Sequence, residues 1–346
     1  MKRASQSDGA HGGEGEEEAE QVVYDAYGFS IGHGAQAGQA PAGGAQWGGC
    51  GDADRRGANK IWDKFMEELV DTGHVSRTRQ LKLLVREGVP GTFRSRLWPC
   101  LAGTAALRQQ FPPRHYEELL LRTGGGMPHD VRVAIDKDLR RTFPGHRMFA
   151  GPDGLAALRR VLVAYSAHAP SIGYCQSLNF VVAMLLLFVN EEEAFWLLDT
   201  MVRKLLPDNY YTPDMGGCLV EQECLRHLAT ERLRESLRRC SLLEADWEVV
   251  TCKWFLCIFV NCLPLATTLR VWDVFFHDGA EALMRISLAI FKLYDEELLE
   301  NGGSHAGGSE STPGGGGTGA LASLQSFAST LHDVDKLFQA AFADPR

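Results

Sequence analysis

The sequence predicts an all-α protein without a sheet, and three observations carry this prediction. Apolar residues recur at helical spacing from position 60 onward, as in Ile61, Phe65 and Leu69, and again over residues 155–165. The alternation of apolar and polar residues that marks a strand is nearly absent. Prolines fall between the helical stretches, where they can start or stop a helix without breaking one, at positions 144, 152, 170, 207 and 264.

Residues 1–57 are expected to form a disordered, acidic tail. They are rich in Gly, Ala, Gln and Glu, and they hold too few large apolar side chains to offset the entropy of ordering them. Residues 22–29 are an exception, because they carry two valines and three aromatic side chains. This segment either docks against the following domain or forms an apolar patch in a floppy tail, and the sequence leaves both interpretations open.

Residues 58–300 are expected to form one helical domain. After the helix that starts near residue 60, the predicted helices cover residues 92–101, 128–141, 172–188, 191–205, 217–239, 246–262, 265–276 and 279–299. Residues 301–320 are Gly-rich and contain nothing that could pack, which predicts a flexible linker. Helical spacing of apolar residues resumes over residues 321–346, and we expect this segment to pack back onto the domain.

Charge and hydropathy exclude two classes of partner. The formal net charge is −9, of which residues 1–57 hold −5, and no run of Lys and Arg is present. Binding to nucleic acid is driven by counterion release at clustered positive charge, so no nucleic-acid partner is expected. The longest apolar run has ten residues, 180–189, whereas a bilayer-spanning helix needs roughly 20. With polar sequence in place of a signal peptide after Met1, the expected location is cytoplasmic.

Common catalytic and metal-binding motifs are missing from the sequence. The nine cysteines include no CxxC pair, and the eleven histidines show no metal-ligand spacing, so reduced thiols and no metal site are expected. GxSxG, HExxH, the Walker-type phosphate loop and a strand-borne GxGxxG are also absent. We therefore expect that the chain binds no nucleotide through its own loops and carries no cofactor of its own.

The first candidate functional segment covers residues 135–144. Asp138 and Arg141 stand three residues apart in a predicted helix, where side chains of this spacing are neighbours. They form either an exposed ion pair, worth about 0–1 kcal/mol, or a carboxylate that holds a guanidinium extended at the helix end. Residues alone favour the exposed pair.

The second candidate segment covers residues 171–179, a polar, small-residue opening to a very apolar helix. Gln176 is placed in the first helical turn. A solvent-facing glutamine there is usually a good helix former and carries little information alone.

Together the two segments resemble the TBC domain of Rab GTPase-activating proteins. The IxxDxxR motif of that family matches Ile135, Asp138 and Arg141. Its YxQ motif matches Tyr174 and Gln176, and the separation of 35 positions between Arg141 and Gln176 is typical of the family.

Further motifs extend the resemblance over roughly residues 60–299. The family's RxxxW motif appears as Arg94 and Trp98, which we expect to brace the fold through a cation–π contact. Residues 194–196, 205–211 and 269–275 are similar to later landmarks of the family, and residues 27–29 and 333–338 have counterparts in some members.

The resemblance implies a multi-helix domain with helices packed at right angles and a catalytic role in trans. Arg141 is implied to be an arginine finger, and Gln176 a glutamine finger that replaces the partner's own glutamine. The implied partner is a GTP-bound Rab, to which GTP and Mg²⁺ belong. The protein would then regulate vesicle trafficking, being transiently recruited to endomembranes through the Rab. The register of the motif is the reason to prefer Arg141 over Arg140.

Other residues of the motifs are assigned supporting roles by the same resemblance. Asp138, Tyr174 and Thr142 are expected to support the fingers, and Ser177 and Asn179 to contact the partner. Ile135 and Pro144 complete the structural part of the motif. The family usually has glycine at the position of Ser177, and we expect activity to survive this departure with altered partner choice.

Two other functions stay open on the sequence alone. A catalytically silent TBC domain would bind a Rab as a scaffold or effector, although the presence of both finger residues argues against it. A helical adaptor unrelated to GTPases would make the two motifs coincidental.

Overall fold

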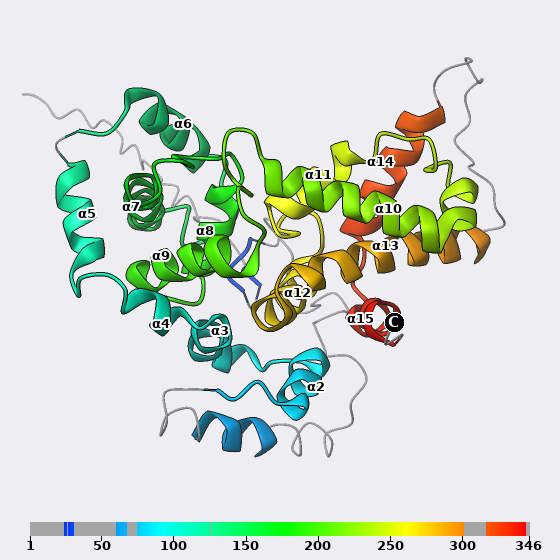
Figure 1. Cartoon of the computed structure of the whole chain (residues 1–346), viewed down its shortest axis with the longest axis horizontal. Helices are drawn as coiled ribbons and strands as arrows, with labels where there is room; N and C mark the ends of the chain where they lie inside the picture. The colour runs from blue at the N-terminus through cyan, green and yellow to red at the C-terminus, as the bar shows by residue number, and fades with distance from the viewer. Residues whose placement is uncertain are drawn as a thin grey trace, which may run out of the picture.

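The computed structural model describes residues 24–25, 27–30, 60–67, 75–124, 126–300 and 316–343. Over these ranges the chain is predominantly helical and contains no strand, which confirms the all-α prediction (Figure 1). Two isolated β-bridges occur, between Tyr24 and Ser30 and between Phe29 and His146. The predicted disordered tail and Gly-rich linker lie mostly outside the described residues.

Residues 60–67 are helical. The helices that follow are α2 (Arg79–Glu87), η1 (Gly91–Phe93), α3 (Arg94–Ala102), α4 (Thr104–Arg108), α5 (His115–Thr123), α6 (His129–Leu139), α7 (Pro152–His168), α8 (Leu178–Leu186), α9 (Glu191–Thr200), η2 (Met201–Leu205), α10 (Gly216–Arg239), α11 (Glu248–Leu256), α12 (Leu265–Asp278), α13 (Ala280–Glu300), α14 (Gly316–Ser329) and α15 (Val334–Phe342).

The helices form two groups joined by α12. In the first group, α7 packs against α5, α6, α8 and α9. In the second group, α13 packs against α10, α14 and α15. The connecting helix α12 contacts α13 as well as α2, α3 and η2, and Figure 1 shows it between the two groups. Helix α14 begins at Gly316, inside the segment predicted to be a linker.

Capping side chains set several helix starts. The Thr78 side chain accepts a hydrogen bond from Leu81 N at the start of α2. The Asn190 side chain accepts a hydrogen bond from Glu193 N at the start of α9. Three glutamates in the first turn of α9 also interact favourably with the positive end of the helix dipole. None of the described helices combines the length and apolarity that a membrane crossing requires.

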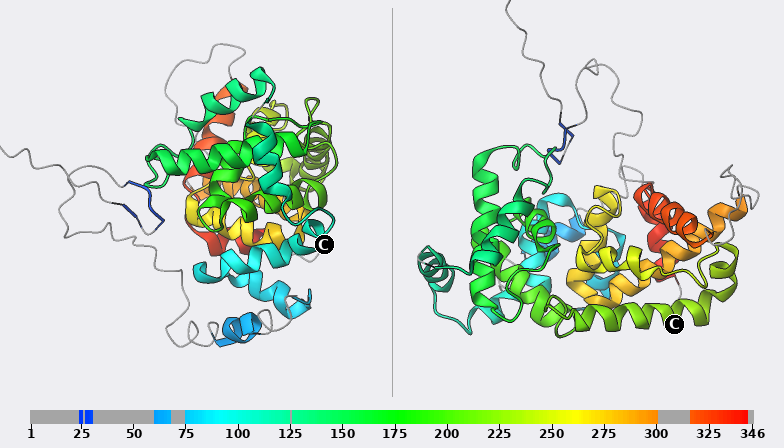
Figure 2. Two further views of the ribbon diagram at one scale, coloured as in Figure 1. Left: turned by 90° about the vertical axis from the view of Figure 1, so that its left-hand side faces the viewer. Right: turned by 90° about the horizontal axis from the view of Figure 1, so that it is seen from above.

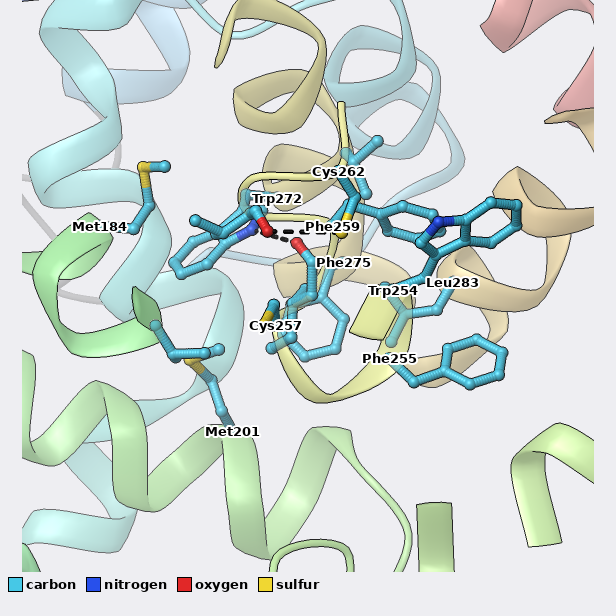
Figure 3. Packing of buried hydrophobic residues seen from close by; sticks show 14 of the residues in the cluster. Met184, Met201, Trp254, Phe255, Cys257, Phe259, Cys262, Trp272, Phe275 and Leu283 are labelled. Atoms are coloured by element: carbon cyan, nitrogen blue, oxygen red, sulfur yellow. Dashed lines mark hydrogen bonds between the residues drawn. The ribbon is translucent and has the colours of Figure 1, made fainter. Parts of the chain in front are cut away.

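Figure 3 shows buried aromatic side chains of the core around the turn that follows α11. The sequence predicts a helix over 246–262, but α11 ends at Leu256. Ile258 and Phe259 then adopt positive φ angles of 48° and 61° and are both 0% exposed. The Trp272 indole donates to the Ile258 carbonyl at 2.9 Å. The positive φ angles therefore end the helix earlier than periodicity predicts, and the Trp272 bond holds the buried turn that replaces it.

Candidate functional site

Arg141 lies in a turn rather than on a helix. The sequence predicts a helix over 128–141, but α6 ends at Leu139. We call residues 140–147 the arginine turn. Thr142 Oγ1 donates to the Asp138 carbonyl at 2.7 Å, and Phe143 has a φ of 45°, so the chain turns away from the helix axis here.

The Asp138 carboxylate joins the two predicted motifs. Its Oδ1 accepts a hydrogen bond from Arg141 Nε at 2.8 Å, and its Oδ2 accepts one from the Tyr174 hydroxyl at 2.7 Å. The Asp138 side chain is 6% exposed, whereas that of Arg141 is 44% exposed. The bond to Asp138 raises the pKa of Arg141 above its ordinary value, although burial opposes the shift. A buried anion thus anchors the inner nitrogen of a guanidinium that reaches into solvent.

A second set of bonds runs beneath this pair. Asn179 Nδ2 donates to Thr142 Oγ1 at 2.7 Å, and Asn179 Oδ1 accepts from Ser177 N at 3.3 Å. The Tyr174 hydroxyl also lies 3.3 Å from Asn179 Oδ1. Burial, followed by the bond to Asp138, raises the pKa of Tyr174 well above its ordinary value, so its hydroxyl remains a donor. The two segments are therefore cross-linked by a closed network of hydrogen bonds.

Asn179 plays a different part from the one expected. Its side chain is 0% exposed and bonds Thr142, so it cannot contact a partner in this arrangement. The prediction of a partner-facing Asn179 was wrong because an amide at the start of a helix gives no signal, in the sequence, of which way it faces. Thr142 is likewise fully buried, which agrees with a supporting position.

Gln176 is exposed on the turn that precedes α8. The sequence predicts a helix over 172–188, but α8 begins at Leu178, and Ser177 before it has φ 114° and ψ −30°. This φ lies in the region that favours glycine, which gives a conformational reason for the glycine usual in the resembled family. Burial raises the pKa of Cys257, and a hydrogen bond with Ser177 partly opposes this, so the Ser177 side chain reaches the turn after α11.

Arg94 and Trp98 belong to the interior. Arg94 Nε and Nη2 each donate to one oxygen of the Asp273 carboxylate at 2.9 Å, and Trp98 Nε1 donates to Oδ1 at 2.8 Å. The side chains of Arg94 and Asp273 are 1% and 0% exposed. Both motif residues are therefore structural, but what joins them is a shared carboxylate from α12.

Comparison with known proteins identifies the fold. The family model described as the Rab-GTPase-TBC domain matches residues 92–299. The chain belongs to this family. This TBC protein is 39% identical over 236 residues to human growth hormone-regulated TBC protein 1, covering 67% of this chain and 69% of the relative. It is 31% identical over 287 residues to human TBC1 domain family member 2B, covering 82% of this chain and 28% of that larger protein.

Solved structures give the same result. The Chlamydomonas flagellar RabGAP TBC domain superposes with a TM-score of 0.70 at 27% identity, covering 92% of this chain and 99% of that one. The Ypt/Rab-GAP domain of Gyp1p superposes with a TM-score of 0.63, covering 83% of this chain and 96% of that one, and at 14% identity it supports the fold alone.

The TBC domain also uses residues that sequence reasoning did not assign to these roles. Asp273 appeared only as a landmark within residues 269–275, yet a carboxylate inside an apolar helix signals a buried, paired charge. Residues 27–30 contact the arginine turn at His146, and nothing in the spacing of the sequence connects these two segments.

Proposed function

We propose that this TBC domain accelerates GTP hydrolysis on a Rab GTPase by placing Arg141 and Gln176 in the partner's nucleotide site. The observation that carries the proposal is the anchoring of Arg141 Nε by the buried Asp138, with the rest of the guanidinium exposed. An arginine held through Nε keeps its two terminal nitrogens for phosphate oxygens, which its planar fork matches.

To accelerate GTP hydrolysis, an activating protein mainly has to position the reacting groups and stabilise the developing charge. Hydrolysis by a small GTPase is slow because charge that develops on the transferred phosphoryl group is poorly stabilised and the attacking water is loosely held. Arg141 would supply the charge, and Gln176, on the adjacent turn, would orient the water. An arginine finger with its domain can contribute up to about 10⁵ in rate, or roughly 7 kcal/mol of barrier.

The partner and setting follow from the same proposal. The substrate would be the GTP-bound form of a Rab, which brings both GTP and Mg²⁺. The domain would act in the cytoplasm and reach endomembranes by binding the Rab there, and so regulate vesicle trafficking.

The test is single-turnover GTP hydrolysis by a panel of purified Rab proteins with and without catalytic amounts of the full chain. One or a few Rabs should be accelerated, and Arg141→Ala, Arg141→Lys and Gln176→Ala should each lose nearly all acceleration while still binding the GTP-loaded Rab. Arg140→Ala is the matched control, because Arg140 is an exposed neighbour outside the hydrogen-bond network and should keep the parent rate.

Two outcomes would overturn the proposal. Binding to a GTP-loaded Rab without acceleration of any Rab would make the domain a scaffold or effector. Parent-like acceleration by Arg141→Lys would remove the finger role from Arg141, since a lysine lacks the planar fork.

A further inference from the structure

Residues 24–30, whose described members we call the N-terminal strap, attach to the arginine turn through the backbone. Ser30 N donates to the Gly145 carbonyl at 2.8 Å, and Arg147 N donates to the Gly28 carbonyl at 2.9 Å. Both views of Figure 2 show the strap, in dark blue, beside the segment that follows α6. The strap thus joins the turn that carries Arg141, from more than a hundred residues away in the sequence.

Hydrogen bonds within the strap set its local shape. The Asp25 carboxylate accepts hydrogen bonds from the backbone N–H groups of Tyr27 and Phe29, each at 2.9 Å. Gly28 between them has a φ of 92°, and a Cβ at this position would lie 2.9 Å from His146 Nε2. Only glycine meets both the conformational and the steric demand. These features indicate a built turn and argue against the apolar patch of a floppy tail.

Tyr27 of the strap contacts two separate parts of the domain, the arginine turn and the buried Arg94. His146 Nε2 donates to the Tyr27 carbonyl at 2.8 Å. Burial opposes the charge of Arg94, whereas Asp273 and a hydrogen bond with the Tyr27 side chain favour it, with the net effect of raising the pKa of Arg94. One residue of the strap therefore bonds the arginine turn with its backbone and the buried Arg94 with its side chain.

Phe143 connects the strap to Arg141, because its ring contacts Phe29 of the strap. It lies two positions after Arg141 and has a φ of 45°, a conformation that costs a bulky residue about 1 kcal/mol or more and persists only where neighbours impose it. Its ring packs edge-on against Phe29 at 5.4 Å between centroids, and against Phe149 and Phe180 at 6.1 and 6.0 Å.

The space around Phe143 is not filled completely. A cavity of about 130 Å³ is lined by residues that include Phe29, Phe143 and Met184. Truncation of Phe29 would enlarge this space and give the Phe143 ring room to leave its imposed position.

We propose that the N-terminal strap is a positioning element of the GTPase-activating site, which fixes the arginine turn and thereby the direction of Arg141. This inference rests on the proposed function. Because Asp138 holds Arg141 from α6, loss of the strap leaves the finger attached but lets residues 143–147 move. The rate of the bound complex therefore falls, while affinity for the Rab is retained.

The experiment uses the full chain with Phe29→Ala, the conservative variant Phe29→Leu and the control Tyr24→Ala, an aromatic residue of the same strap whose side chain is 39% exposed. For Phe29→Ala the maximal single-turnover rate constant should fall about tenfold, with the half-saturating concentration of the TBC protein unchanged within about twofold. Phe29→Leu should recover most of the rate, and Tyr24→Ala should match the parent.

Hydrogen exchange of residues 140–147 gives a readout that does not depend on GTPase activation. Exchange in this segment should rise in Phe29→Ala and stay at the parent level in Tyr24→Ala, because Arg147 N donates to the strap. Unchanged exchange, or a loss of rate that comes wholly from weaker Rab binding, would overturn the positioning role. Absence of acceleration by the parent chain would overturn the proposed function, with exchange still deciding whether the strap holds the turn.

Discussion

The Asp138 carboxylate binds two donors that belong to different motifs, Arg141 and Tyr174. A carboxylate that is 6% exposed and accepts two hydrogen bonds differs from the exposed ion pair that the sequence alone favours. Spacing in the sequence predicts the contact with Arg141 correctly. The spacing of the motif gives no information about Tyr174, which lies on a turn 36 residues further along the chain. Its bond to Asp138 turns the Asp138–Arg141 pair into a buried junction of three side chains.

Replacement of Asp138 by Asn tests the charge of this junction. Asparagine keeps the shape and one carbonyl oxygen but removes the anion, and a hydrogen bond to a charged group is worth about 1.5–3 kcal/mol. The maximal GTPase-activating rate should fall about 10- to 100-fold. Asp136→Asn is the control, since Asp136 lies on the same helix and pairs with Arg159 at the surface. Equal rates for both variants would show that Asp138 does not orient the finger.

Ser177 and Asn179 show which properties of single residues the sequence withholds. Resemblance marks Ser177 as a departure from glycine, but only the backbone angle of 114° gives its conformational consequence. Asn179 stands within the polar opening of the segment, yet its side chain is buried against Thr142. The direction of a single side chain depends on packing against distant parts of the chain, and the periodicity of the sequence does not predict it.

At the scale of elements, sequence periodicity finds the helices and misplaces their ends. The predicted helices 128–141 and 172–188 both extend into turns that carry the proposed fingers, because α6 ends at Leu139 and α8 begins at Leu178. Apolar spacing reports which face is buried, whereas the turns are set by bonds from distant residues such as Asn179 and Ser30. The site therefore lies where sequence patterning is least informative.

Attachment of the strap should depend on pH through His146. Burial, assisted by Arg147, lowers the pKa of His146 from its ordinary 6.5, although the Tyr27 carbonyl and Asp25 oppose the shift. Met148 N donates to His146 Nδ1 at 3.1 Å, so protonation replaces an acceptor with a second donor. The neutral ring is thus favoured in the folded state. Its contribution is complete above pH 6.5 and is lost as the pH falls below 6.5 toward the lower folded pKa.

Titration of the His146 ring by NMR measures this dependence, with the resonance assigned by its absence in His146→Gln. The midpoint should lie below 6.5 in the parent and move toward 6.5 in Phe29→Ala, where the strap no longer buries the ring. A parent midpoint at or above 6.5 would contradict the buried, neutral state.

At the scale of the whole molecule, a buried charge pair joins α12 to α3. Arg94 and Trp98 on α3 bond Asp273 on α12, 179 and 175 residues away in the sequence. The sequence predicts that Arg94 and Trp98 are structural, and the fold class follows from periodicity alone. The identity of their partner does not follow, because which helices meet is decided by packing over the entire chain.

Asp273→Asn should lower the stability of the entire domain. It leaves the Arg94 guanidinium, 1% exposed, in the interior without its compensating anion, and breaking a buried pair in this way costs about 3–5 kcal/mol. Urea unfolding at constant m-value measures the change, and Asp136→Asn, in an exposed pair, should cost about 0–1 kcal/mol. If both variants lost the same small amount, Asp273 would not hold α3 to α12. A loss confined to Asp273→Asn would identify this carboxylate as the link between α3 and α12.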